Sequence, residues 1–410
     1  MTRIRLLVIA AFVGIAFLSG NLRAQAERST VVVNPNASGQ GTARTIQEGI
    51  DMVREGGTVL VRPGTYEEQL AITKGLTIES IGDGSGPVII WPSGTPSSVI
   101  EILTASPVTL RDLTVRVPGV SGIRGIGAVD VTIDGANVVA VSPPLGVLSV
   151  LIFVSNQALD GSRARLVVRD SFVDGTIASP PVTQSFGVQQ AGNVDALFER
   201  NVIRRVGGAC IFVVTRADLG GETNADILNN DLDECHPLGR VASILVGPGG
   251  GNLPSPARPL TATGIVNIIG NTIRNSSGNC LNNAIAYEVY TGRIEHNRIL
   301  DVVQPCAVPT VRGMPGAIWV GRLTPVFPFP PVTPSVRFND IEGNAHAGLR
   351  IAPNQTIAID ASCNYWGSES GPSGIGPGTG DAILVEPGGA APVFMPFAPA
   401  PIAGTAATGC

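Results

Sequence analysis

The sequence has little charge, few aromatic side chains and a single lysine. Only 14% of its 410 residues are charged and 5% are aromatic, and Lys74 is the one candidate for a lysine nucleophile. Acidic residues outnumber basic ones by 32 to 27, and the resulting net charge of −5 argues against nucleic acid as a partner. Intrinsic disorder is disfavoured as well, because a hydrophobic share of 44% is too high for it.

Long apolar runs are scarce too, and the main one lies at the N-terminus. Two arginines precede the apolar residues 6–18, and A-Q-A follows at 24–26. This pattern predicts a signal peptide cleaved after Ala26, and therefore a secreted or periplasmic protein. Cleavage would remove three arginines, leaving 24 basic against 32 acidic residues and a net charge of −8. No later run reaches the roughly 18 apolar residues of a spanning helix, so no membrane span is expected.

Glycine and proline are abundant, with 51 and 32 residues, which suits many short strands joined by turns. A weak repeat, apolar-x-x-Asn/Asp-x-apolar, recurs at steps of 25 to 42 residues without the apolar spacing of a helix. Its clearest anchors are Asp170, Asn201, Asn230, Asn271, Asn297, Asn339 and Asn364, and weaker forms contain Glu79 and Asp134. A second apolar run, such as CIFVV or AIWV, follows most anchors and predicts a second strand per repeat.

These repeats predict a coil of short strands in which each turn of the chain stacks on the last at about 4.8 Å. Inward apolar residues would form a continuous column. The asparagines fit the corners, because asparagine accepts a left-handed backbone and its amide can hydrogen-bond to its counterpart one coil away.

Six cysteines, none in C-x-x-C spacing, favour disulfides over zinc or thiol redox chemistry in an exported chain. Cys280 and Cys306 each lie nine residues after an anchor, in adjacent coils, and one coil of separation suits a disulfide. We therefore expect Cys280 to pair with Cys306. The other expected pairs are Cys210 with Cys235, and Cys363 with Cys410, which would hold down the C-terminal tail.

A short helix is predicted at about residues 45–55. Thr45 and Glu48 form a capping box, and Gly56-Gly57 is expected to end the helix. One face is apolar, formed by Ile46, Ile50 and Val53. A stack of strands ends in an unpaired edge that could recruit other chains, so we expect this helix to cover it. The first coil would then begin with strands at 58–61 and 69–72.

The stretch TIQEGIDMVREGGTVLVRPGTYEEQLAI, the N-x-I coils and the late CNYWGSESGP resemble the right-handed parallel β-helix proteins of the pectin-lyase-like superfamily. The combination is most similar to bacterial exported proteins with parallel β-helix (PbH1) repeats. The resemblance implies an all-β solenoid at 27–398 with a helical N-terminal cap, followed by a tail at 399–410. It also implies that Trp366 plugs the core or caps its end.

The resemblance gives little guidance on activity, because this fold serves lyases, glycosidases, esterases, epimerases, tailspikes and adhesins. The sequence lacks the N-T-D, D-D, G-H-G and R-x-K signatures of polygalacturonases and the D-P-H-D of epimerases. It also lacks the D-F-x-F-G of pectin methylesterases and the R-x-P-x-x-R of pectate lyases. We therefore find no complete catalytic motif of these enzyme families in the sequence.

The remaining candidates for chemistry form a loose cluster in NNDLDECHP. Asp231, Asp233, Glu234 and His236 lie together in sequence, and strand alternation puts Asp231 and Asp233 on one face. Such carboxylates could act as acid and base or bind calcium, or the segment could be a solvated turn. Two weaker pairs have simpler structural interpretations: Asp170 with Asp174, and Glu67 with Glu68.

Insertions at 141–161, 247–260 and 321–335 interrupt the repeat and could form a binding face. Phe327 and Phe329 lie between prolines, where they could stack on sugar rings or fold back on the coil. The three histidines, at 236, 296 and 346, fall in different coils, so no metal site is predicted.

The sequence thus predicts an exported monomer that binds a polysaccharide or cell-surface glycan without catalysis, or that serves as a surface scaffold. The alternative is a polysaccharide lyase or glycoside hydrolase built on the 231–236 cluster. A second alternative is a periplasmic metal-associated accessory protein. No cofactor is expected, with calcium as the one candidate ion.

Overall fold

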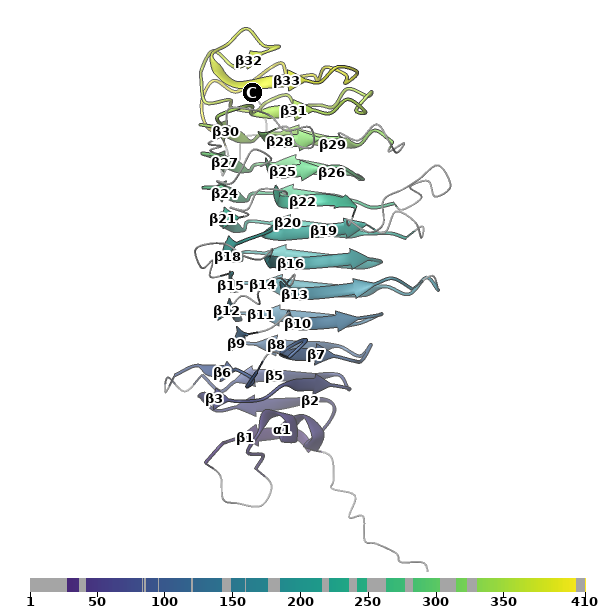
Figure 1. Cartoon of the computed structure of the whole chain (residues 1–410), viewed down its shortest axis with the longest axis vertical. Coiled ribbons are helices and arrows are strands. Elements are labelled where there is room, and N and C mark those ends of the chain that lie inside the picture. The colour runs from purple at the N-terminus through teal and green to yellow at the C-terminus, as the bar shows by residue number, and fades with distance from the viewer. Residues whose placement is uncertain are drawn as a thin grey trace, which may run out of the picture.

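The chain forms a tall column of stacked β-strands (Figure 1). A computed structural model describes residues 28–36, 42–82, 84, 86–94, 96–118, 121–141, 149–158, 160–175, 185–215, 221–235, 242–248, 263–276, 283–302, 315–322, 330–402 and 410. Every strand pairing recorded between these residues is parallel, and the strands form three sheets. The right-handed parallel β-helix predicted from the sequence is confirmed.

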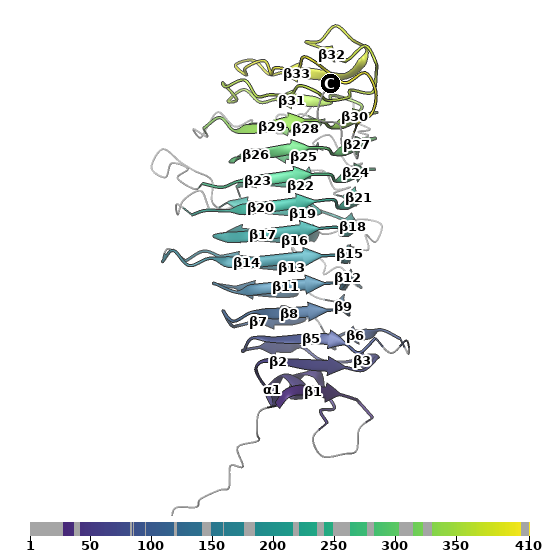
Figure 2. The ribbon, with the colours of Figure 1, turned by 180° about the vertical axis from the view of Figure 1, so that it is seen from behind.

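Sheet A contains eleven strands within the described residues. They are β1 (Arg28–Val33), β2 (Val53–Val61), β5 (Leu76–Ser80), β8 (Val108–Arg111), β11 (Asp130–Asp134), β14 (Ala164–Arg169), β17 (Val194–Glu199), β20 (Asn224–Leu228), β23 (Val266–Ile269), β26 (Thr291–Glu295) and β29 (Thr333–Arg337). Figure 2 shows their stacking from the other side of the column.

Sheet B has ten short strands in the same part of the chain. They are β3 (Gly64–Tyr66), β6 (Val88–Ile90), β9 (Leu113–Val117), β12 (Asn137–Ala140), β15 (Phe172–Asp174), β18 (Val202–Val206), β21 (Asp231–Cys235), β24 (Thr272–Arg274), β27 (Arg298–Leu300) and β30 (Asp340–Glu342). The sequence pattern indicated two strands per coil, and this third strand was missed because its three to five residues are too short to show alternation.

Sheet C has twelve strands among the described residues. They are β4 (Leu70–Ile72), β7 (Ile100–Ile102), β10 (Ser121–Ile126), β13 (Ser149–Asn156), β16 (Ser185–Gly192), β19 (Ile211–Thr215), β22 (Ala242–Pro248), β25 (Asn283–Tyr287), β28 (Gly316–Val320), β31 (Leu349–Ile351), β32 (Pro372–Gly374) and β33 (Gly380–Val385). Each coil therefore visits A, B and C in turn, from β2–β3–β4 to β29–β30–β31.

A ladder of buried asparagines lines the corner between sheets A and B. Asn271 Oδ1 accepts hydrogen bonds from the backbone N–H and from Nδ2 of Asn230, both at 2.9 Å. Asn271 in turn donates from both of its nitrogens to Asn297 Oδ1. The same contact repeats through six buried residues, Asn201, Asn230, Asn271, Asn297, Asn339 and Asn364. The predicted link between asparagines of successive coils is thus confirmed.

The corner differs from the prediction in one respect: the left-handed residue precedes the asparagine. Arg200, Asn229 and His296 have φ of 52°, 55° and 57°, whereas the asparagine that follows each serves the ladder. Asp170 also has the left-handed φ, 50°, so Ser171 occupies the ladder position in its coil and donates its N–H to Asn201 Oδ1. In this coil the sequence pattern therefore identifies Asp170, one residue before the true ladder position at Ser171.

Helix α1 (Ile46–Met52) covers the N-terminal end of the column, as predicted (Figure 1). The Thr45–Glu48 capping box is present, and Ile46 and Ile50 are buried. Two details were wrong. Strand β1 precedes the helix and pairs with β2, and α1 ends at Met52 rather than at Gly56-Gly57, because Val53 is already extended and opens β2.

Two charged residues of the first coil hold the ends of α1. Glu68 accepts hydrogen bonds from the backbone N–H groups of Ile46 at 2.7 Å and Gln47 at 2.9 Å. Lys74 Nζ donates to the carbonyl oxygen of Val53 at 2.6 Å. These contacts satisfy backbone groups that a helix leaves open at its ends. The single lysine and the second glutamate of TYEE thus have structural roles.

Replacing Glu68 with alanine is expected to lower the free energy of unfolding by about 1–2 kcal/mol, because two helical N–H groups lose a charged acceptor. Glu67→Ala is the matched control, since Glu67 is the exposed neighbour on the same turn. Urea denaturation of both variants checks the prediction. Equal stability of the two variants would contradict it.

Two of the three predicted disulfides are present among the described residues. Cys210 pairs with Cys235 at a Cα–Cα distance of 5.6 Å, and Cys363 pairs with Cys410 at 5.4 Å. The prediction for Cys280 and Cys306 falls outside the described residues, as does the predicted signal peptide. No helix in the described part of the chain is long and apolar enough to cross a membrane.

Candidate functional site near the C-terminal end

The carboxylates singled out in the sequence are engaged by an arginine. Asp231 and Asp233 both lie on the outer face of β21, as strand alternation predicted. Arg274, one coil further on, places its guanidinium 2.7 Å from Asp231 Oδ1 and 3.4 Å from Asp233 Oδ2. Glu234 is exposed at a left-handed corner, and His236 lies outside the described residues. This arrangement favours a structural role for the pair.

Such pairing is the rule on the outer faces of sheets A and B. Arg111 bridges Glu79 at 3.1 Å and Asp134 at 3.6 Å on successive strands of sheet A. On sheet B, Arg205 pairs with the buried Asp174. Asp170, the other member of that sequence pair, is held by Arg200 at 2.8 Å. Acidic and basic residues therefore alternate from coil to coil and compensate each other.

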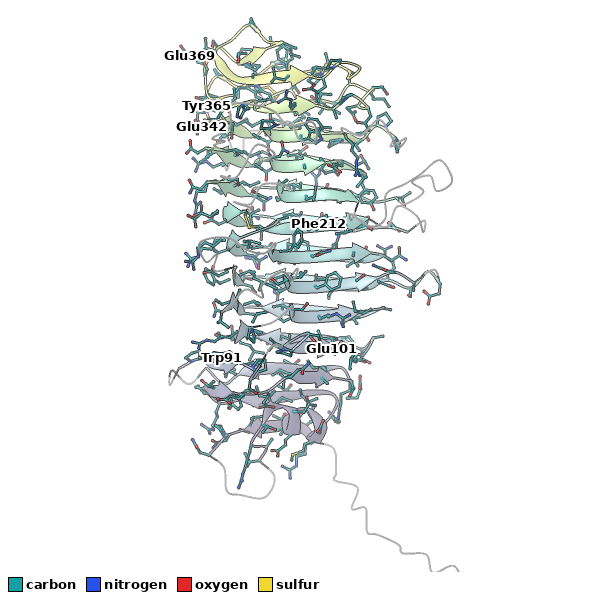
Figure 3. The ribbon with its side chains drawn as sticks, in the orientation of Figure 1. Trp91, Glu101, Phe212, Glu342, Tyr365 and Glu369 are labelled. Atoms are coloured by element: carbon teal, nitrogen blue, oxygen red, sulfur yellow. A yellow bond between two sulfur atoms is a disulfide. The ribbon has the colours of Figure 1, made fainter. Side chains whose placement is uncertain are left out.

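The pattern changes in the last coils, where a cavity of about 520 Å³ opens beside β27 and β30. Its wall includes three carboxylates, from Asp301, Glu342 and Asp381, together with His346 and the hydroxyls of Ser373 and Thr379. Figure 3 shows Glu342 on this edge of the column, with Tyr365 and Glu369 close by. The cavity lining contains no lysine or arginine within the described residues.

Asp381 occupies the end of a second corner ladder, between sheets B and C. Asn344 Oδ1 accepts the N–H of Val302 at 3.1 Å, and Asp381 Oδ2 accepts the Nδ2–H of Asn344 at 2.7 Å and its backbone N–H at 3.1 Å. One carboxylate oxygen thus does what the amide oxygen of an asparagine does elsewhere. An asparagine at 381 would serve the ladder equally well, so the negative charge is not needed for the corner.

The charge of Asp381 is disfavoured in its surroundings. Burial, which is the largest cause, and the nearby Glu342 carboxylate raise the pKa of Asp381 to about 6, although the hydrogen bonds from Asn344 oppose the shift. Burial and the carboxylates of Glu342, Asp340 and Glu369 likewise raise the pKa of Tyr365. A carboxyl group that titrates near neutrality can both accept a hydrogen bond and exchange a proton.

This shift predicts how stability changes with pH. The folded state holds the Asp381 proton up to about pH 6, whereas an unfolded aspartate loses it near about pH 3.9. As pH rises, ionisation of Asp381 therefore lowers the free energy of the unfolded state before that of the folded state. The free energy of unfolding falls between these two pH values. The Asp381→Asn variant has no carboxyl group to ionise at this position. Its free energy of unfolding should therefore exceed that of the wild type by about 1–2 kcal/mol at pH 7 and by almost nothing at pH 3.5. Urea denaturation across this range measures the difference, and a constant difference would contradict the assignment.

Other sequence candidates do not join this cavity. His296 sits at a corner of the first ladder, where its ring stacks on Phe338 with centroids 5.2 Å apart. Phe327 and Phe329 lie outside the described residues, as does much of the three insertions. Nowhere in the described part of the chain do three His, Cys, Asp or Glu side chains come together as metal ligands.

Sequence reasoning missed Asp301, Glu342 and Asp381 because they belong to different coils, up to 80 residues apart. The alignment of successive coils contains one signal that points to the cavity. The outward column of sheet B runs Asp174, Arg204, Asp233, Arg274, Leu300 and Glu342. Leucine at 300 breaks the alternation of charge at the cavity wall, but it can be recognised only once the register is known.

Comparisons with known proteins give no family by sequence: no protein-family model matches, and no curated protein has significant similarity. Solved structures do show similarity. A pectin methylesterase from Erwinia chrysanthemi aligns over 70% of this chain and 92% of its own, with 13% identity and a TM-score of 0.41. The Dettilon tailspike protein aligns over 87% and 68%, with 13% identity and a TM-score of 0.46.

A lacto-N-biosidase from Eubacterium ramulus aligns over 90% of this chain and 68% of its own, with 11% identity and a TM-score of 0.40. Similarity at this level transfers no activity, substrate or site residue to the present chain. The fold assignment rests on the three parallel sheets themselves.

Proposed function

We propose that the protein binds a glycan in the C-terminal cavity and does not transform it. The observation that supports this most directly is the cavity itself, which has the volume of a small-molecule site and a wall rich in hydrogen-bond acceptors. Sugar hydroxyls are donors that suit the carboxylates of Glu342 and Asp301, and they can also accept from Ser373 and Thr379.

The surrounding architecture fits a binding role. The β-helix holds wall residues at β27 and β30 of sheet B and at β33 of sheet C, so the site is built before a ligand arrives. Two disulfides suit an oxidising compartment, and we propose that the chain is exported after cleavage behind Ala26. We also propose that residues 27–398 fold as one domain and act as a monomer.

A second candidate function is glycoside hydrolysis at the same cavity. It is favoured by one observation, that Asp381 shares its surroundings with Glu342 and titrates near about pH 6. A carboxyl group with a raised pKa beside a second carboxyl group is what a general acid and its partner require. A lyase acting on uronates is less compatible, because three carboxylates would repel an anionic sugar.

The test is a titration of the purified mature protein with neutral, acidic and basic oligosaccharides, with product formation followed in the same samples. Glu342→Gln should weaken binding roughly tenfold or more, because it removes a charged acceptor. Asp231→Asn is the control, being another carboxylate on the same sheet, and should bind normally. Binding by neither wild type nor control would refute the proposal. New reducing ends that Asp381→Asn abolishes would replace it with hydrolysis.

A further inference from the structure

Glu342, on the cavity wall, lacks the arginine neighbour that the other carboxylates of its column have. Along sheet B, Arg204 follows Asp174 with their charged groups 3.5 Å apart, and Arg274 follows Asp233 with theirs 3.4 Å apart. The next two positions in register are Leu300 and Glu342. Glu342 therefore has a leucine on the preceding strand of the sheet, whereas Asp174 and Asp233, the earlier carboxylates of this column, each have an arginine on a neighbouring strand.

The other acidic groups at this end are uncompensated in the same way. Within the described residues, Asp301, Glu342, Glu369 and Asp381 form no ion pair, whereas Glu79, Asp134, Asp170 and Asp231 each pair with an arginine. Like charges at short range destabilise each other. A group of carboxylates gathered without cations in a cavity is what a positively charged ligand would neutralise.

Buried polar atoms next to the cavity also lack partners. Trp366 lines the cavity and is fully buried, and its Nε1–H donates to no acceptor among the described residues. His346 Nε2, on the same wall, is likewise buried and without a hydrogen bond in that part of the structure. Unsatisfied buried groups are rare in proteins and call for a partner.

We infer that the cavity selects an amino sugar, a glycan unit that carries a free ammonium group, over its N-acetylated, neutral and uronic acid counterparts. The ammonium would lie between Glu342 and the neighbouring carboxylates and supply the positive charge that Arg274 supplies to Asp233. This inference rests on the proposed glycan-binding function and specifies its ligand. A metal ion is less well supported, because these carboxylates do not converge as a ligand set in the described structure.

The matched variant replaces Leu300 with arginine and so places an arginine beside Glu342, as Arg274 lies beside Asp233. Its guanidinium would pair with Glu342 and occupy the site of the ligand cation. Leu300→Met is the control, because it keeps a long uncharged side chain at the same partly buried position. Thermal denaturation of both variants establishes that the column remains folded.

The experiment is calorimetric titration at pH 7 with β-1,4-linked glucosamine oligosaccharides and with the same oligosaccharides after N-acetylation. We expect the amino form to bind at least tenfold more tightly to the wild type and to the Leu300→Met variant. The Leu300→Arg variant should lose that preference, through weaker binding of the amino form alone.

Equal binding of the two forms by the wild type would overturn the inference and leave glycan binding in place. Binding of neither form would refute the inference, and the proposed function would be refuted as well only if the neutral and acidic oligosaccharides also fail to bind. Retention of the preference in Leu300→Arg would also overturn the inference, because it would place the cation elsewhere. Calcium chloride is titrated in parallel: saturable calcium binding that Leu300→Arg abolishes, without sugar binding, would assign the cavity to a metal ion instead.

Discussion

Replacing Asn271 with alanine should lower the free energy of unfolding by about 3–5 kcal/mol, because several buried polar groups lose their partners at once. Asn271 Oδ1 serves the N–H and Nδ2 of Asn230, and its Nδ2 serves the carbonyl oxygen of Ile227 and Asn297 Oδ1. Asn271 is fully buried, so water does not replace these contacts. The change therefore affects the coils on both sides.

Asn267→Ala is the matched control for this prediction. Asn267 lies on the outer face of sheet A in the same coil, where its Nδ2 donates to Asp226 Oδ1 at 2.8 Å. Removing the Asn267 side chain should lower the free energy of unfolding by less than about 1 kcal/mol, since water can solvate the groups left behind. Urea denaturation followed by circular dichroism compares the two variants. A similar small loss for both would show that the ladder contributes little to stability.

Replacing Trp366 with alanine should lower the free energy of unfolding by about 3–5 kcal/mol, because it leaves a cavity at the C-terminal end of the core. Trp366 is 0% exposed and is the largest fully buried side chain of the core. Gly348 accommodates it, because a Cβ at that position would lie 3.1 Å from Trp366 Cε3. The prediction from sequence that Trp366 plugs the core agrees with this packing.

Trp91→Ala provides the comparison, since Trp91 is 40% exposed on the outer surface near β6 (Figure 3). Its ring contacts the Arg116 guanidinium at 4.9 Å, which is worth about 0.5–1 kcal/mol at an exposed site. Limited proteolysis should release C-terminal fragments from Trp366→Ala and leave Trp91→Ala intact. Equal resistance of both variants would contradict the assignment of Trp366 to the core.

The fold could be read from the sequence because its repeats leave a periodic signal. Asn201, Asn230 and Asn271 recur at corners, and the capping box at Thr45 marks the helix that closes the column. A third strand in each coil was not recognised, since the three to five residues of a sheet B strand give little alternation. Asp170 was placed one position off because aspartate suits both the left-handed corner and the pattern sought.

The site could not be read in the same way. Adjacent carboxylates such as Asp231 and Asp233 are visible in sequence, but their partner Arg274 comes 41 residues after Asp233, and only the strand register shows that it pairs with them. Asp301, Glu342 and Asp381 are isolated in sequence and meet only when successive coils stack. Variable coil length hides this alignment, so the position of Leu300 beside Glu342 can be recognised only once the strands are paired.

The most direct measurement of the proposed function is a crystal structure of the mature protein with a bound oligosaccharide that the titrations have identified. The proposal predicts sugar density in the cavity between Glu342 and Asp381, with sugar oxygen or nitrogen atoms within hydrogen-bond distance of both carboxylates. Sugar bound on another face of the column, with this cavity empty, would contradict it.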